Sequence, residues 1–157
     1  MPPNSPLRGQ KKQRRHYSGK KKRHTQKAQV IVHQESKRII ATAFGQGRTH
    51  DFRLFKESGV QFAAKTLCLA DKGYTGITKL HPNSRIPVKK SKDSPLTPEE
   101  EKKANRALAK ERISAEHVIG RLKVFRILSE RYRNRRKRFR LRFNLIAAIY
   151  NLEIASS

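Results

Sequence analysis

The sequence is poor in several residue types, and each shortage excludes a class of protein. A single cysteine, Cys68, excludes a disulfide framework and a zinc site built from thiolates. Because Cys68 lies inside an apolar run, we expect it to be a small buried side chain. No apolar run approaches the roughly 18 residues that span a bilayer, and the first residues lack the apolar segment of a signal peptide. We therefore expect a cytoplasmic protein, associated with the nucleoid and without a membrane partner.

Acidic residues are scarce. The 157 residues include 12 Asp and Glu against 38 Lys and Arg, a formal charge of +26, and residues 1–34 contain no acid at all. This excess is larger than solubility requires and predicts a polyanionic partner. The length allows one domain with a core. We divide the chain into a basic N-terminal arm, residues 1–27, and a domain, residues 28–157.

Two segments concentrate the cations. The arm carries ten Lys and Arg together with prolines that oppose regular structure, and residues 131–142 carry eight more. Cations interleaved with hydroxyl and aromatic groups suit contact with phosphates, although a solvated basic tail is the alternative. The nucleic-acid-binding residues that we expect here are Arg14, Arg15, Lys20, Lys21, Lys22, Arg23, His24, Arg133, Arg135, Arg136, Lys137 and Arg138.

Apolar patterning predicts the first elements of the domain. Residues 29–33 and 38–44 are rich in β-branched side chains and are joined by a short polar link, which predicts an antiparallel hairpin. A short helix should then run to about Glu57. We expect Asp51 to be its N-cap or first-turn acid rather than a catalytic group. Residues 86–88 contain an internal proline and predict an edge strand.

The run from Thr66 to Tyr74 is the central feature of the sequence. Four consecutive apolar residues, the last of them Ala70, precede Asp71, and Gly73 follows. This pattern predicts a strand that is buried on both faces and ends where Asp71 enters a loop. A carboxylate at that position suits chemistry, but Asp also simply opens turns. The run by itself leaves both interpretations open.

A long helix is predicted next. Thr97, Pro98 and Glu100 have the types and spacing of a helix start with a capping box. The helical period continues to about Leu128, and the side chains on one face should pack on the core: Leu108, Ala115, Val118, Ile119, Leu122 and Phe125. A final apolar helix should occupy the second half of residues 139–152.

Glu116 lies at the edge of the apolar face of this long helix. Arg112 precedes it by four residues and Lys123 follows by seven, so a helix places all three on one flank. A carboxylate in this setting can bind a metal ion near a phosphate, or it can merely pair with Arg112.

Five blocks in one order resemble a known family. They resemble the catalytic half of DDE transposases from bacterial insertion sequences, in the branch related to the eukaryotic Harbinger elements, and the likeness covers nearly the whole chain. The blocks are YSGKKKRHT (17–25), THDFRL (49–54), LADKGY (69–74), AEHVIGRLK (115–123) and YRNRR (132–136).

The resemblance implies a fold, a chemistry and a set of site residues. The fold would be α/β, a ribonuclease-H-like mixed sheet flanked by helices, and the chemistry would be DNA cleavage and joining at element ends with two Mg²⁺ or Mn²⁺ ions. Asp71 and Glu116 would be the second and third acids of the triad and metal ligands, while Arg112 and Lys123 would contact DNA phosphates. Because the long helix should pack on the sheet with the Glu116 edge towards the strand ends, we expect the two carboxylates to lie about 4–8 Å apart, within reach of a common metal ion. The partners would be double-stranded DNA, at terminal repeats and target, and a second copy of the chain.

One departure from the family pattern is important. The first acid of the family lies on a strand before the 17–25 block, where this sequence has no acid. The chain is then either the downstream product of a transposase split over two reading frames, completed by an upstream product, or a truncated remnant. Asp51 and Glu35 are the candidates for a replacement ligand. The rival interpretation is a non-catalytic basic nucleic-acid-binding protein, or a repressor derived from a transposase.

Overall fold

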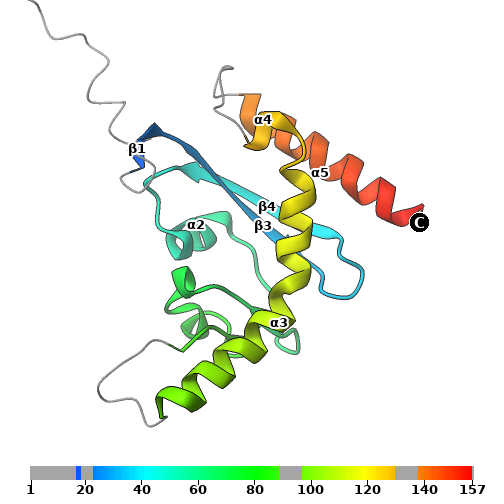
Figure 1. Ribbon diagram of the computed structural model, residues 1–157. Helices are drawn as coiled ribbons and strands as arrows, with labels where there is room; N and C mark the ends of the chain where they lie inside the picture. The colour runs from blue at the N-terminus through cyan, green and yellow to red at the C-terminus, as the bar shows by residue number, and fades with distance from the viewer. Residues whose placement is uncertain (1–16, 19–22, 89–96, 130–137, 157) are drawn as a thin grey trace, which may run out of the picture.

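The computed structural model describes residues 17–18, 23–88, 97–129 and 138–156 (Figure 1). These residues form an α/β structure with three two-stranded sheets. In chain order the elements are β1 (Tyr17–Ser18), β2 (Arg23–His24), β3 (Gln26–Val32), β4 (Ile39–Gln46), α2 (Asp51–Ser58), β5 (Cys68–Leu69), the 3₁₀ helices η2 (Lys72–Tyr74) and η3 (Ile77–Lys79), β6 (Ser84–Arg85), α3 (Pro98–Leu122), α4 (Arg126–Ser129) and α5 (Phe139–Ala155).

The predicted hairpin is confirmed. β3 and β4 pair antiparallel, with Gln26 opposite Gln46 and a register irregularity between Ile31 and Val32. β3 begins at Gln26, so the expected boundary between arm and domain falls inside this strand. Because successive side chains point to opposite faces, the two faces of the hairpin contact different parts of the molecule.

Each face of the hairpin packs on its own apolar cluster. On one side, α3 and α5 cover Ile39 and Phe44, with Val118 and Phe143 as central residues of that cluster. On the other side, α2, the residue after β5, and η3 form a smaller cluster of Phe55, Ala70 and Ile77, against which Ile31 packs. Figure 1 shows the same division, with α2 and α5 on opposite sides of β3 and β4. None of the described helices is long and apolar enough to cross a membrane.

The start of α3 agrees with the sequence, but its end does not. Thr97 and Glu100 form the predicted capping box, with Pro98 in the first turn. The helix ends at Leu122 instead of continuing to Leu128. After the break, α4 places Ile127 and Leu128 against the cluster of α5, and this contact replaces a longer straight helix.

Two residues predicted for the core face of α3 lie outside the core. Ile119 is 37% exposed and Phe125 is 39% exposed, whereas Leu108, Val118 and Leu122 are buried as expected. Phe125 falls in the break between α3 and α4. Ile119 lines a groove that is described below.

The strand before Asp71 is shorter and more open than predicted. β5 contains two residues and pairs in parallel with β6, and Leu67 just before it is 40% exposed. The prediction of a strand buried on both faces was wrong, because Cys68 and Leu69 are only half-buried. Among the described residues, β5 also has a strand neighbour on one edge alone. The predicted strand at 86–88 lies two residues earlier, as β6, since Pro87 has no N–H to continue the ladder.

Two asparagine side chains fasten the long helices to the rest of the fold. On α5, Oδ1 of Asn151 accepts a hydrogen bond from the Ile39 N–H at 2.8 Å, and Nδ2 of Asn151 donates one to the Ile39 carbonyl at 2.9 Å. On α3, Asn105 makes the same pair of bonds with Val88, at 2.8 and 3.2 Å. Each amide therefore replaces the main-chain partner that another strand would supply.

We predict that Asn151→Ala lowers the free energy of unfolding by about 2–4 kcal/mol, because it leaves the N–H and carbonyl of Ile39 without partners in a partly buried position. Asn144→Ala, in the same helix, is the matched control. Asn144 is exposed and accepts a bond from Thr42, so this variant reports the helix-propensity change together with the loss of one exposed hydrogen bond. Denaturant titration measures both variants, and equal losses would contradict the role of Asn151.

Candidate active site

Asp71 follows β5 and caps a short 3₁₀ helix. Its carboxylate accepts a hydrogen bond from the Lys72 N–H at 2.7 Å, at the start of η2. Ala70, the residue before it, is buried in the smaller apolar cluster. The turn-opening interpretation is therefore correct for one oxygen of Asp71. The carboxylate remains 63% exposed and free to face other groups.

A single guanidinium joins Asp71 to α3. Arg112 lies with Nη1 at 3.4 Å from Oδ1 of Asp71 and with Nη2 at 4.0 Å from Oε1 of Glu116. Both nitrogens belong to one planar group, so the two contacts plus the width of that group limit the separation of these oxygens to roughly 10 Å. The structure thus brings together two acids that lie far apart in the sequence. Both carboxylates are 63% exposed, and the Arg112 side chain is 20% exposed.

Asp51 lies close to the loop that follows Asp71. It is the first-turn acid of α2, where His50 is the N-cap residue, and it pairs with Lys27 of β3 at 2.9 Å. A Cβ atom on Gly73 would lie 2.7 Å from Oδ2 of Asp51. The absence of a side chain at Gly73 therefore lets α2 and the Asp71 loop approach each other.

Tyr74 reports the negative charge of this region. Burial, together with the nearby carboxylates of Asp51 and Asp71, raises the pKa of Tyr74 to about 12. A phenol resists ionisation when it is desolvated and surrounded by anions. The same electrostatic environment would favour the binding of a cation.

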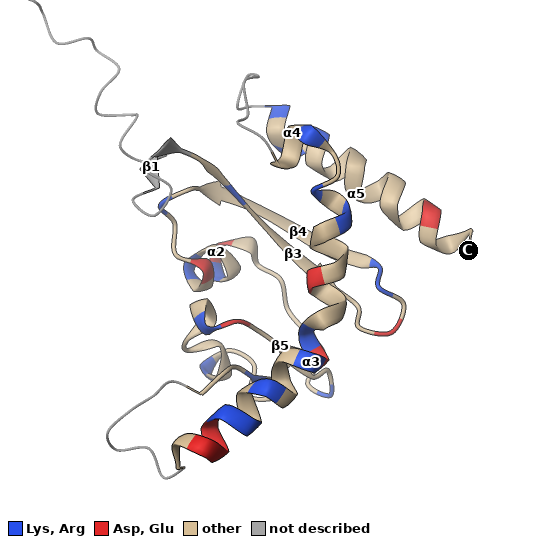
Figure 2. Ribbon diagram, in the orientation of Figure 1, with Lys and Arg blue, Asp and Glu red and all other residues tan. Residues whose placement is uncertain are grey.

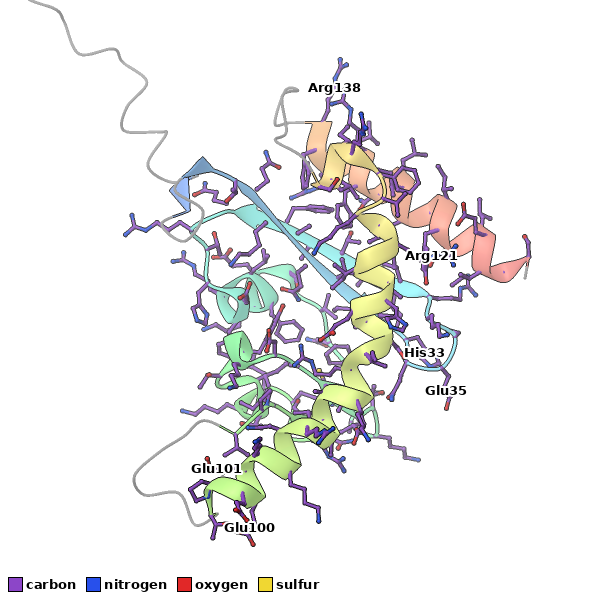
Figure 3. All side chains as sticks on the ribbon, in the orientation of Figure 1. His33, Glu35, Glu100, Glu101, Arg121 and Arg138 are labelled. Carbon is purple, nitrogen blue, oxygen red and sulfur yellow. The ribbon has the colours of Figure 1, made fainter. Side chains whose placement is uncertain are left out.

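The acids described here do not form a complete metal cage. No group of three or more His, Cys, Asp and Glu within the described ranges is arranged to hold a metal ion. Glu35, a candidate replacement ligand, is exposed in the turn between β3 and β4, and Figure 3 shows it at the outer end of the hairpin. Asp71 and Glu116 suit a hard cation such as Mg²⁺, which is commonly held by one or two carboxylates and water. In this structure a cationic group, the Arg112 guanidinium, contacts both carboxylates.

A groove of about 1030 Å³ runs past Asp71 and Arg112. β3 lines one wall, the segment from Thr66 to Asp71 lines another, and α3 contributes Arg112 and Ile119. Gln29 of β3 also lines the groove, and although it is buried, its Oε1 accepts no hydrogen bond from the described residues. Cys68 lines the groove as well and is half-buried, with its pKa raised by burial.

Most of the predicted DNA-binding cations lie outside the described residues. Arg112 and Lys123 both line the groove, and Arg138 projects outward at the start of α5 in Figure 3. Figure 2 shows cations along α3 and at the start of α5, whereas acids gather in the first turn of α3. The structure does not describe Arg14, Arg15, Lys20, Lys21, Lys22, Arg133, Arg135, Arg136 and Lys137, nor the side chains of Arg23 and His24.

The sequence did not predict the roles of three residues of this region. Lys27 was assigned to the basic arm, yet it pairs with Asp51 and also donates to the Thr49 carbonyl at 2.6 Å. Gly73 and Tyr74 belong to the LADKGY block, which was the available signal, but their contacts with α2 depend on the tertiary fold.

We predict that Tyr74 ionises near pH 12 and that Asp51→Asn lowers this midpoint, because one of the anions that oppose ionisation is removed. Ultraviolet absorbance of phenolate follows the titration, and Tyr74→Phe identifies the signal. Glu57→Gln, which removes an exposed acid of α2 paired with Arg53, is the control and should leave the midpoint unchanged. Since an unfolded tyrosine ionises at about pH 10, this group should decrease stability as the pH rises from about 10 towards 12. An ionisation midpoint of Tyr74 that is the same in Asp51→Asn and in the wild type would contradict this electrostatic account.

Comparison with known proteins identifies the family. The sequence profile of the family described as "DDE superfamily endonuclease" matches residues 3–151. The chain is also 53% identical over 152 residues to the "Probable transposase for insertion sequence element IS702" of Microchaete diplosiphon. That alignment covers 96% of this chain but 55% of the relative, so the chain spans about half the length of the protein it matches. No solved structure matches the chain significantly. With nearly its whole length matched, and with the acids of two of its sequence blocks brought to one guanidinium, this chain belongs to the DDE endonuclease superfamily.

Proposed function

We propose that this chain is part of an insertion-sequence transposase that cleaves double-stranded DNA at the ends of its element and joins them to a target, acting at the nucleoid in the cytoplasm. Asp71 and Glu116 are its second and third acids. The observation that carries the proposal is the contact of both carboxylates with one cationic group, Arg112. Family membership and the identity with the transposase relative support the reaction class.

The roles of the residues follow from their chemistry. Two Mg²⁺ or Mn²⁺ ions, when bound, would activate the attacking oxygen and stabilise the leaving oxygen of a phosphodiester. Asp71 and Glu116 would hold the ions, because hard cations take carboxylate oxygens. Lys123 and Arg112 would contact DNA phosphates along the groove that they line. Lys123 and Arg112 would not transfer a proton in this mechanism.

We further infer that the first acid arrives on an additional strand, supplied by a polypeptide outside the described residues. β3 pairs with β4 alone and β5 with β6 alone in the described part of the chain, and the groove separates them. An extended segment in this groove would satisfy unpaired strand edges and offer a partner to the side chain of Gln29. It would join the sheets into one mixed sheet of ribonuclease-H-like type and bring its acid near Asp71.

The proposed function predicts complementation. We expect the purified chain alone not to cleave DNA, because two carboxylates do not hold both ions in a productive geometry. Co-expression with the portion of the IS702 relative that this chain lacks should restore Mg²⁺-dependent cleavage of element ends, measured by release of labelled DNA. Asp71→Asn or Glu116→Gln should reduce that cleavage to background and leave DNA binding nearly unchanged.

Glu57→Gln is the matched control for this complementation and should keep full activity, since Glu57 pairs with Arg53 on an exposed turn of α2. Cleavage that survives Asp71→Asn would overturn the assignment of the second acid. Strong cleavage by residues 1–157 alone would show that the site is complete, and would point to Asp51 or Glu35 as the third ligand.

The cation excess predicts a strongly salt-dependent affinity for DNA. If the basic arm and residues 131–142 engage about six phosphates, log K should fall against log salt concentration with a slope near −5. Fluorescence anisotropy of a labelled duplex measures the slope. A slope close to zero would reject the electrostatic mode of binding.

A further inference from the structure

We propose that Arg112 is a displaceable cation of the Asp71–Glu116 site: its guanidinium neutralises the two carboxylates in the absence of a divalent ion, and it moves to a DNA phosphate when a divalent ion binds. Arg112 would then couple the affinity for metal to the affinity for DNA. This inference deepens the proposed function and rests on it.

The contact distances favour a guanidinium that can leave. At 3.4 Å from Asp71 and 4.0 Å from Glu116, neither contact is as short as the 2.7–2.9 Å expected for a tight charge-assisted hydrogen bond. Arg112 therefore lies between the two acids without forming a bidentate pair with either. Both carboxylates are largely exposed, so solvent weakens each ion pair further.

The charges explain why Arg112 stabilises the two carboxylates when no divalent ion is bound, and why a divalent ion can replace it. Two carboxylates near one another repel, and no other described cation lies within ion-pair distance of Asp71 or Glu116. One guanidinium offsets one of the two negative charges, whereas a divalent ion, when bound, would offset both. Arg112 and a divalent ion therefore compete for the same oxygens.

The groove gives Arg112 a second place to bind. Arg112 of α3 lines it together with Lys123, the residue that follows α3. A guanidinium binds phosphate in a planar, two-bond geometry. If DNA in the groove holds Arg112, the carboxylates lose their competitor and bind a divalent ion more tightly. By thermodynamic reciprocity, a divalent ion then strengthens DNA binding by the same factor.

The test measures Mn²⁺ binding to the full chain, by electron paramagnetic resonance of free Mn²⁺, with and without a short duplex whose own Mn²⁺ binding is subtracted. Without DNA, we expect Arg112→Gln to bind Mn²⁺ roughly 5- to 10-fold more tightly than the wild type, because the competitor is gone. Saturating duplex should raise the Mn²⁺ affinity of the wild type and leave that of Arg112→Gln unchanged. Arg112→Lys keeps the charge but offers a single ammonium group, so its affinity should be intermediate.

Arg85→Gln is the matched control. Arg85 pairs with Glu111, one position before Arg112 on α3, at 3.9 Å, so this variant removes the same charge from the same region without touching the site. It should bind Mn²⁺ as the wild type does. Circular dichroism of each variant verifies the fold, and Arg112→Lys serves if Arg112→Gln does not fold.

The outcomes separate this inference from the proposed function. If Glu116→Gln weakens Mn²⁺ binding but Arg112→Gln binds no more tightly than the wild type, Arg112 is a structural clamp and the inference is overturned while the site stands. If the wild type, Arg112→Gln and Glu116→Gln bind Mn²⁺ equally, the site itself is wrong. Metal affinity that rises with DNA equally in the wild type and Arg112→Gln would also overturn the inference.

Discussion

The course of α3 is the constraint on which the rest of the structure depends. Its C-terminal half packs on the β3–β4 hairpin and α5 through Val118 and Leu122. Towards its N-terminus, Asn105 binds the main chain of Val88, just after β6. One rigid element therefore spans both parts of the molecule, and Arg112 and Glu116 lie between these two attachments. A helix fixed at both ends can hold a carboxylate opposite a loop from another element, as a catalytic site requires.

The composition of the chain conflicts with the chemistry that we propose for its site. A formal charge of +26 favours DNA, but the proposed site for divalent ions needs local negative charge. The fold resolves this conflict by gathering part of its few acids in one region. Asp51 and Asp71 are close enough to Tyr74 to raise its pKa, and Glu116 shares a guanidinium with Asp71. Lys27 and Arg112 offset the mutual repulsion of these acids without filling the groove.

The agreement between sequence and structure is best where the signal is local. The capping box of Thr97 and Glu100 depends on residues within one turn, and the hairpin depends on adjacent β-branched runs, so both were predictable. The end of α3 could not be predicted from the sequence, because it depends on the packing of Ile127 and Leu128 against the apolar cluster of α5. The length of β5 could not be predicted either, because a strand extends only as far as its neighbours pair with it.

Residue order and spacing were enough to indicate the family, the two acids that we propose for the site, Asp71 and Glu116, and a polyanionic partner. The contact of Arg112 with both acids, the pairing of Asp51 with Lys27 and the groove between β3 and β5 could be seen in the folded structure alone. The physical reason is the distance along the chain over which the interacting residues are separated. Residue type and spacing within one element fix what a side chain can do, while the meeting of side chains from different elements depends on how those elements pack.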